Sequence, residues 1–200
     1  VRSKAYLFSG VEIRWKSEIE DGNTPMEATF HFPGGLADYL RETLGKSTTY
    51  AENPFAGTVE FQERFGVPGK VEWAINWTPA RDGFIQSYCN TVPTPEGGTH
   101  EGGFWAAILK GIRAYGELAN NRKAKDITRD DLITGGCALV SCFIREPEFV
   151  GQTKDRLATT EAARLVENAV RDHFDNWLAA DTKSAGAILD FLVLLRDLET

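Results

Sequence analysis

Two polar segments of the sequence carry residue types that can bind a phosphate group. The first is the run Thr94–Phe104, which places four glycines between a predicted strand and a predicted amphipathic helix. Backbone N–H groups at the start of a helix can bind an anion. Glycine also permits close packing in a tight strand-to-helix turn, so a purely structural role stays open. His100, within this run, has no obvious catalytic partner nearby in the sequence.

The second segment is Glu148–Leu157, which lies between a predicted buried strand and a predicted long helix. Gln152 supplies an amide that can orient a phosphate oxygen or a water molecule. Lys154 supplies a mobile positive charge that suits a terminal phosphate. The alternative interpretation is a solvated loop that is simply rich in polar residues.

Two further segments resemble functional motifs only in part. Leu44–Thr48 is similar to the end of a phosphate-binding loop, but the full pattern needs a glycine where Leu40 stands and a preceding strand. We therefore interpret this run as a helix-capping glycine followed by a polar loop. Arg122, Lys123 and Lys125 form a small basic cluster, which is either a solvated patch or a contact for nucleic acid.

The composition limits the class of protein. The 200 residues, 42% of them hydrophobic, suffice for one globular domain with an appended helical segment. The net charge of −7 argues against a surface that wraps nucleic acid unaided, because phosphate binding needs a basic footprint. No run approaches the roughly 18 apolar residues that cross a bilayer, and no signal peptide opens the chain. The chain begins at Val1 and its only methionine is Met26, which suggests a piece of a longer protein.

The cysteines indicate a reducing compartment. Cys89, Cys137 and Cys142 are odd in number, and two of them lie in an apolar run, as small buried thiols do. A zinc site would need paired C-x-x-C spacings, which the sequence lacks, so we expect no metal site. We therefore expect a cytoplasmic protein.

Apolar periodicity predicts strands mainly in the first half and helices mainly in the second. The short apolar run 137–144 fits a strand buried on both faces. The helix 185–198 is apolar around much of its circumference, so it must pack against its own domain or a partner chain. The fold class is α+β, with an antiparallel or mixed sheet covered by helices. The predicted strands are 11–15, 26–32, 59–63, 71–77, 84–92 and 137–144, and the predicted helices are 36–44, 103–120, 160–178 and 185–198, with another starting near Thr128.

Both polar segments resemble motifs of one family. The run containing Gly97-Gly98-Thr99-His100 is similar to the "GGTH" segment, and Gln152-Thr153-Lys154 to the "QTK" loop, of the B subunits of bacterial type IIA DNA topoisomerases. Their order, separation and strand-to-helix contexts agree with that family. The resemblance covers essentially the whole chain, and Trp177-Leu178 together with Gly151-Gln152 favours topoisomerase IV over DNA gyrase.

The resemblance implies a transducer domain over residues 1–180 and a C-terminal helix over 181–200 that leads toward the rest of the subunit. The fold implied is a ribosomal-protein-like βαβ arrangement with a left-handed crossover, an exception to the usual handedness, and with long C-terminal helices. In the family, an N-terminal GHKL-type domain holds ATP and Mg²⁺ and supplies the general base. No motif of that domain occurs here, so we expect this chain to bind no cofactor and to be inactive alone.

The resemblance also implies roles for individual residues. Gln152 and Lys154 would contact the ATP γ-phosphate, and Lys154 would be catalytic, stabilising the charge that builds during hydrolysis. The GGTH residues carry over with a structural role only. The implied partners are the DNA-cleaving A subunit, a second B subunit on ATP binding, and DNA, with no membrane.

Two other functions stay open at this point. One is a nucleic-acid-binding module of the same fold, without nucleotide sensing, that uses Arg122, Lys123 and Lys125. The other is a free-standing small-molecule kinase of related topology, which would need a phosphate loop of its own that the sequence does not contain.

Overall fold

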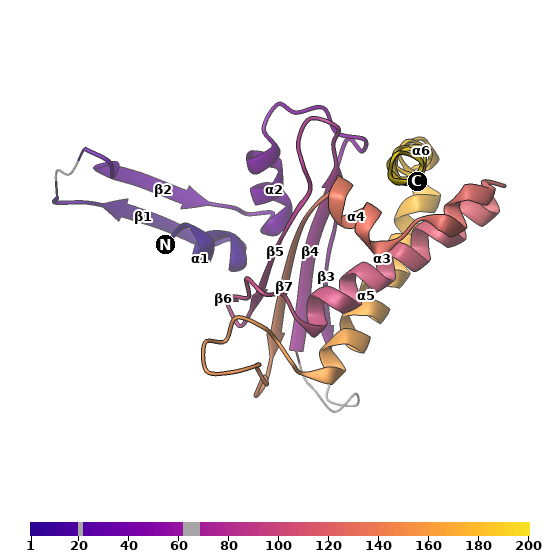
Figure 1. The fold of residues 1–200 in the computed structure, drawn as a ribbon. Helices are drawn as coiled ribbons and strands as arrows, with labels where there is room; N and C mark the ends of the chain where they lie inside the picture. The colour runs from indigo at the N-terminus through magenta and orange to yellow at the C-terminus, as the bar shows by residue number, and fades with distance from the viewer. Residues whose placement is uncertain (20–21, 62–68) are drawn as a thin grey trace.

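A five-stranded mixed sheet forms the centre of the computed structural model, which describes residues 1–19, 22–61 and 69–200 (Figure 1). Strands β5 and β7 are parallel, and every other neighbouring pair in this sheet is antiparallel. Of the two arrangements expected from the sequence, antiparallel or mixed, the sheet is thus the mixed one. The strand order is β3-β4-β7-β5-β6, with β3 at Phe55–Phe61, β4 at Gly69–Trp77, β5 at Phe84–Cys89, β6 at Val92–Pro93 and β7 at Gly136–Ile144.

The parallel pair β5 and β7 is joined by a helical crossover. Helix α3 (Thr99–Leu118), the short 3-10 turn η2 (Arg122–Asp126) and helix α4 (Arg129–Gly135) lie between the two strands in sequence. Because β7 has neighbours on both edges and helices over both faces, its residues are buried with one exception, which explains its nearly unbroken apolar run. The βαβ unit is present, and the left hand expected for its crossover stays a prediction.

Helices α3, α5 (Thr160–Ala180) and α6 (Thr182–Glu199) cover one face of the sheet (Figure 1). Every second residue of β4 from Val71 to Trp77 points into the core beneath them, as strand alternation requires. Ile188 and Leu192 of α6 are fully buried in the same core. The apolar C-terminal helix therefore packs within its own chain. Among the described residues, no helix is both long and apolar enough to span a bilayer.

Helices α1 (Arg2–Leu7) and α2 (Leu36–Leu44) pack on the opposite face of the sheet. The Glu72 carboxylate of β4 accepts a hydrogen bond of 2.8 Å from the Leu36 N–H and so caps α2 from outside the helix. Burial raises the pKa of Glu72 even though this bond favours its charged form. The predicted end of α2 at Gly45 is confirmed, and α1 was not predicted because six residues give too little periodicity.

An antiparallel hairpin, β1 (Glu12–Lys16) with β2 (Glu27–His31), projects from the body of the molecule at the left of Figure 1. Both strands were predicted from alternating residues, and their existence is confirmed. Ile13, Ala28 and Phe30 are partly buried, as the half-buried pattern predicts. Trp15 and Met26 depart from that pattern, because they are 38% and 46% exposed. The described part of the chain covers neither face of the hairpin fully.

Three predicted boundaries need correction. The strand expected over 84–92 turns at Asn90 and Thr91, whose φ values of 49° and 67° suit a tight hairpin, so its end becomes the separate strand β6. The strand expected over 59–63 begins at Phe55, and residues 62–63 lie outside the described residues. Only Asp181 separates α5 from α6, and its carboxylate accepts the Ser184 N–H as a helix cap.

Candidate functional site

The loop between β7 and α5, residues 145–159, presents Gln152 and Lys154 to solvent. Neither side chain forms a hydrogen bond or ion pair with the described part of the chain. Lys154 has a φ of 59°, in the left-handed region that residues with side chains rarely adopt. Such backbone strain persists only where surrounding contacts impose it, and it gathers at functional sites. An ammonium and a nearby amide, both without a polar partner in the described chain, are therefore exposed at this loop.

Backbone hydrogen bonds close the base of this loop. The Val150 N–H donates to the Arg156 carbonyl at 2.9 Å, and the Ala158 N–H donates to the Glu148 carbonyl at 2.8 Å. Leu157 between them is 1% exposed and belongs to a small core with Cys89, Cys142, Ile144 and Ala162. The loop is thus a short hairpin that is pinned at its base and free at its tip.

The glycine-rich segment is the surface against which this loop is pinned. Helix α3 begins at Thr99, four residues before the predicted start, so His100 and both later glycines lie inside the helix. The Thr99 N–H donates to the Leu157 carbonyl at 3.1 Å, and no side chain caps the helix start. One donor of the first turn is therefore occupied by the neighbouring loop. The geometry supports the packing interpretation of this segment over the anion-binding one.

A chain of buried polar side chains ties the first turn of α3 to the sheet. The Ser87 hydroxyl of β5 lies 2.7 Å from the Thr94 hydroxyl and donates to the Glu101 carboxylate at 2.8 Å. The Thr94 Oγ1 lies 3.0 Å from the His100 Nε2. His100 is fully buried, and this burial lowers its pKa to about 4. His100 is consequently a neutral internal residue that no substrate can reach.

A hollow of about 570 Å³ lies between this turn and the base of the loop. Arg129 and Arg156 line it, together with Glu96 and Glu101. Burial raises the pKa of Glu101, while the Ser87 hydroxyl and the two guanidinium groups act in the opposite direction. The hollow is therefore lined by both positively and negatively charged side chains.

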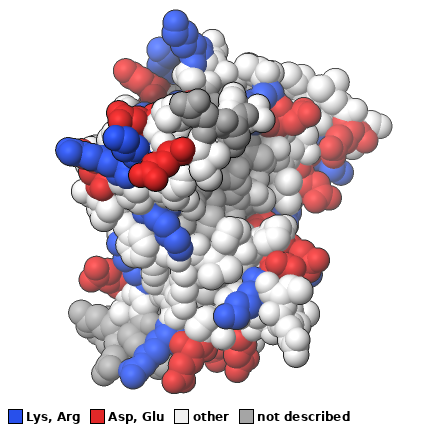
Figure 2. Space-filling model, turned by 90° about the vertical axis from the view of Figure 1, so that its left-hand side faces the viewer, with Lys and Arg blue, Asp and Glu red and all other residues white. Residues whose placement is uncertain are grey.

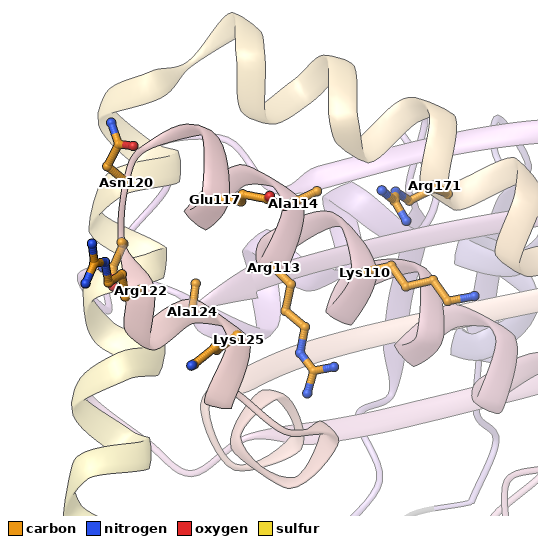
Figure 3. Close-up of a pocket in the computed structure, with 10 residues that line it drawn as sticks. Lys110, Arg113, Ala114, Glu117, Asn120, Arg122, Ala124, Lys125 and Arg171 are labelled. Atoms are coloured by element: carbon orange, nitrogen blue, oxygen red, sulfur yellow. The ribbon is translucent and has the colours of Figure 1, made fainter.

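A second, larger hollow of about 930 Å³ lies at the far end of α3, and we call it the basic groove. Figure 3 shows its lining side chains on α3, η2 and α5. Glu117 is its only acidic lining residue among those described. Its positively charged lining residues are Lys110, Arg113, Arg122, Lys125 and Arg171.

Three of these cations are already engaged. The Lys110 ammonium pairs with the Glu167 carboxylate, Arg171 pairs with Asp175 at 3.1 Å, and Arg113 donates two hydrogen bonds to the backbone carbonyl of Ile127. Arg122 and Lys125 are exposed and form no ion pair within the described chain.

The basic cluster expected in a loop lies instead on the 3-10 turn η2. That turn sends Lys123 away from its two neighbours in the cluster. The Lys123 ammonium pairs with Asp197 of α6 at 2.6 Å and does not line the basic groove. Two of the three predicted cluster residues, Arg122 and Lys125, thus face the groove.

The face that Figure 2 shows, on the hairpin side of the molecule, intermixes Lys and Arg with Asp and Glu. The run from Gly45 to Thr48 follows the end of α2, not a strand, so it lacks the setting of a phosphate loop. Within the described residues, no three His, Cys, Asp or Glu side chains lie together as metal ligands would.

Comparisons with known proteins point to one family. A family model described as DNA gyrase B matches residues 35–197. The B subunit of DNA topoisomerase 4 from Caulobacter vibrioides is 54% identical over 199 residues, which cover 96% of this chain and 28% of that protein. Its namesake from Bartonella bacilliformis is 48% identical over 196 residues, with the same coverage of 96% and 28%.

Solved structures agree with this assignment. The topoisomerase IV ATP-binding domain of Francisella tularensis matches with a TM-score of 0.78 and 26% identity, over 99% of this chain and 51% of that chain. The 43K ATPase domain of Thermus thermophilus gyrase B matches with a TM-score of 0.78 and 27% identity, over 96% and 50%. The chain thus spans about half of these solved chains and 28% of the two curated relatives.

Proposed function

The chain belongs to the DNA gyrase B family, and we propose that it is the transducer domain of an ATP-hydrolysing topoisomerase B subunit of the topoisomerase IV type. In this proposal the whole subunit is part of an enzyme that changes the topology of DNA. Residues 1–180 form the transducer domain, and residues 181–200 lead toward the rest of the subunit. The enzyme works in the cytoplasm, where this subunit is joined by an A subunit, a second B subunit and DNA.

The exposed loop with its unpaired Lys154 ammonium is the observation that carries the proposed sensing role. The side chains of Gln152 and Lys154 lie at the free tip of a loop whose base is fixed. Because hydrogen bonds already hold the backbone at the base of the loop, a phosphate contact would mainly have to order the two side chains, which lowers its entropic cost. These properties fit a contact to a nucleotide that is bound mainly by a domain outside this chain.

When bound, ATP with Mg²⁺ would supply a terminal phosphoryl group that carries negative charge. Gln152 would orient that group through its amide, and Lys154 would place a positive charge beside it. A fixed positive charge near the developing charge stabilises the transition state more than the ground state. Lys154 is therefore the catalytic residue that we assign to this chain.

The loop is also placed to transmit the state of the nucleotide. Its last residue, Thr159, precedes α5 directly, and α5 packs along α3 and over the sheet. A contact that exists before phosphate release and vanishes afterwards gives two states of different energy. We propose that the loop converts this difference into a rigid-body swing of the domain through α5 and α6.

The test is Lys154→Ala in the intact subunit, with ATP turnover as the measurement. We expect kcat to fall by about 10²–10³-fold, or about 3–4 kcal/mol, which is the usual effect of removing one preorganised donor. The thermal unfolding midpoint should stay unchanged because the exposed side chain forms no hydrogen bond or ion pair in the described chain. Turnover within a few-fold of wild type would refute the catalytic role.

Lys46→Ala is the matched control, since Lys46 is also exposed and unpaired in the described chain. It should leave turnover unchanged, and it also tests the phosphate-loop-like run that contains it. The 200-residue chain by itself should show no ATP turnover. Turnover in the isolated chain would favour the free-standing kinase instead.

The basic groove supports a second candidate function, the binding of nucleic acid. Arg122 and Lys125 present unpaired positive charge at its rim. Such side chains bind phosphates without reading sequence. This function could accompany nucleotide sensing in the intact enzyme, or it could replace sensing altogether.

A further inference from the structure

The Gly97-Gly98 turn contacts the loop of residues 145–159 directly, through backbone hydrogen bonds that the two motifs by themselves do not predict. Leu157 pairs with Gly98 in a parallel bridge and with Phe149 in an antiparallel bridge, so it lies between the two segments like a short central strand. The Leu157 N–H donates to the Gly97 carbonyl at 3.1 Å, and its carbonyl accepts the Thr99 N–H at the same distance. Leu157 is thereby fixed on both sides.

Lys154 lies only three residues before this fixed point. Three extended residues span at most roughly 10 Å, so the Cα of Lys154 cannot move farther than that from Leu157. The Glu96 N–H also donates to the Asp155 carbonyl at 3.0 Å. The glycine-rich segment therefore holds the chain immediately after Lys154.

The other limb of the loop is held through Thr159. Thr159 stands at the N-cap position of α5, yet its hydroxyl does not cap that helix. Its Oγ1 instead accepts the Glu148 N–H at 2.9 Å, and its carbonyl accepts the Thr99 hydroxyl at 2.7 Å. Thr99 of α3 and Thr159 of α5 together fasten both ends of the loop to the starts of two long helices.

Gly98 tolerates no side chain in this arrangement. Its φ of 141° lies in the region that favours glycine, and a Cβ there would lie 2.4 Å from the Leu157 carbonyl oxygen and 2.6 Å from its nitrogen. Gly97, with a φ of 73°, would bring a Cβ within 2.8 Å of the Glu101 carboxylate. A side chain at Gly98 would push away the backbone that fixes Leu157.

We propose that the Gly97-Gly98 turn is the positioning element for Lys154, an inference that rests on the function proposed above. Gly98 touches no nucleotide and acts only through Leu157. It holds the loop in one register against α3, and this register sets where the ammonium lies when the nucleotide-holding domain approaches. A misplacement of about 1 Å in a reacting group can cost about 10²-fold in rate, so the turn controls turnover from a distance.

The first test measures the anchor without any nucleotide. Hydrogen exchange in the intact subunit should become faster for peptides covering residues 148–158 in Gly98→Ala, while peptides covering β4 keep their protection. Gly102→Ala is the matched control, because a Cβ at Gly102 meets nothing within 4 Å. Unchanged exchange over residues 148–158 in Gly98→Ala would overturn the inference.

The second test is a double-mutant cycle on ATP turnover with Gly98→Ala, Lys154→Ala and the double variant. We expect Gly98→Ala to lower kcat by about 10–10²-fold, since the lysine is displaced but not removed. The double variant should be no slower than Lys154→Ala, because the turn acts through that lysine. If the fold-loss in kcat of the double variant equals the product of the two single losses, the positioning role is overturned.

The two tests separate this inference from the proposed function. Normal turnover in Lys154→Ala refutes the catalytic role of Lys154, and with it the positioning role, whatever the exchange data show. If Lys154→Ala turns over ATP slowly, the catalytic role stands. Unchanged hydrogen exchange over residues 148–158 in Gly98→Ala, or losses in kcat that multiply in the double variant, then refutes the positioning role alone.

Thr159→Val serves where Gly98→Ala fails to fold. It removes only the hydroxyl that accepts the Glu148 N–H and keeps the side-chain shape. We expect faster exchange over residues 148–150 and a loss in kcat of about 10-fold that is absent in the Lys154→Ala background. Thr160→Val, at the exposed neighbouring position, is its control. An equal fold-loss in kcat from Thr159→Val in the wild type and in the Lys154→Ala variant would overturn the inference.

Discussion

His100 shows at the scale of a single residue how a motif position can look catalytic and be structural. It lies in the first turn of α3, fully buried, with Thr94 as the partner of its Nε2. Its Nδ1 has no hydrogen-bond partner among the described residues. Burial lowers its pKa from 6.5 to about 4, so the folded chain holds it neutral.

This pKa predicts a loss of stability in mild acid. Below pH 6.5 the unfolded chain binds a proton on this histidine that the folded chain does not bind until about pH 4. The free energy of unfolding therefore falls as the pH decreases between these two values, at up to about 1.4 kcal/mol per pH unit. The measurement is urea unfolding of wild type and His100→Gln across this range, and we expect the wild type to lose up to about 3 kcal/mol relative to the variant.

The comparison with His100→Gln removes the contribution of other groups. Burial raises the pKa of Glu72 and Glu101, which act with the opposite sign because their protonation favours the folded state in acid. Both proteins contain these two carboxyl groups, so their effects cancel in the difference. Parallel pH profiles of the two proteins would contradict the prediction.

The contact between α3 and α5 explains, at the scale of elements, why glycines stand inside a long helix. A Cβ at Gly103 would lie 2.2 Å from the Ala163 carbonyl oxygen, and one at Gly111 would lie 2.4 Å from the Phe174 ring. The two helices thus approach closely at two points. Helix propensity alone disfavours glycine in a helix interior, and so the sequence pattern placed the start of α3 four residues too late.

Neighbouring glycines make this packing testable. Gly103→Ala should lower the free energy of unfolding by about 1–3 kcal/mol, because the backbone of α5 must move. Gly102→Ala meets nothing within 4 Å and should be neutral or raise that free energy by up to about 1 kcal/mol through helix propensity. Urea unfolding of the two variants measures both values. Equal effects at the two positions would show that the close approach of the helices is not needed.

The distribution of charge decides, at the scale of the whole molecule, how nucleic acid could bind. The net charge of −7 repels a polyanion at long range, while the basic groove concentrates positive charge at one end of α3. Binding through this groove would therefore be local and sensitive to salt. It would depend on the intact enzyme to bring DNA close to the groove.

The groove makes a prediction for DNA binding by the intact enzyme. The double substitution Arg122→Ala with Lys125→Ala should weaken binding and reduce the slope of log K against log salt by up to about 2, since each phosphate contact contributes about 0.9. Lys46→Ala with Lys183→Ala removes the same charge from exposed positions outside the groove. Equal slopes in wild type and the groove variant, or an equal loss in the control, would exclude the groove as a DNA contact.

The sequence by itself determined the types of most elements and the motifs that they carry. Alternation identified β4 and the hairpin strands, apolar spacing identified α5 and α6, and Thr128 marked the start of α4, where its hydroxyl and Asp131 form a capping box. These signals are local, because strand and helix periods repeat within a few residues. The two polar motifs are local in the same sense, because each consists of consecutive residues, and the sequence alone therefore sufficed to recognise them.

Only the tertiary structure decided how the two motifs meet. The hydrogen bond from Thr99 to Thr159 joins residues 60 positions apart, and the close approach of Gly98 to Leu157 depends on α3 and α5 lying side by side. The basic groove likewise gathers side chains from three elements. Contacts of this kind arise from how whole elements pack on the sheet, and residue spacing along one segment does not encode that packing.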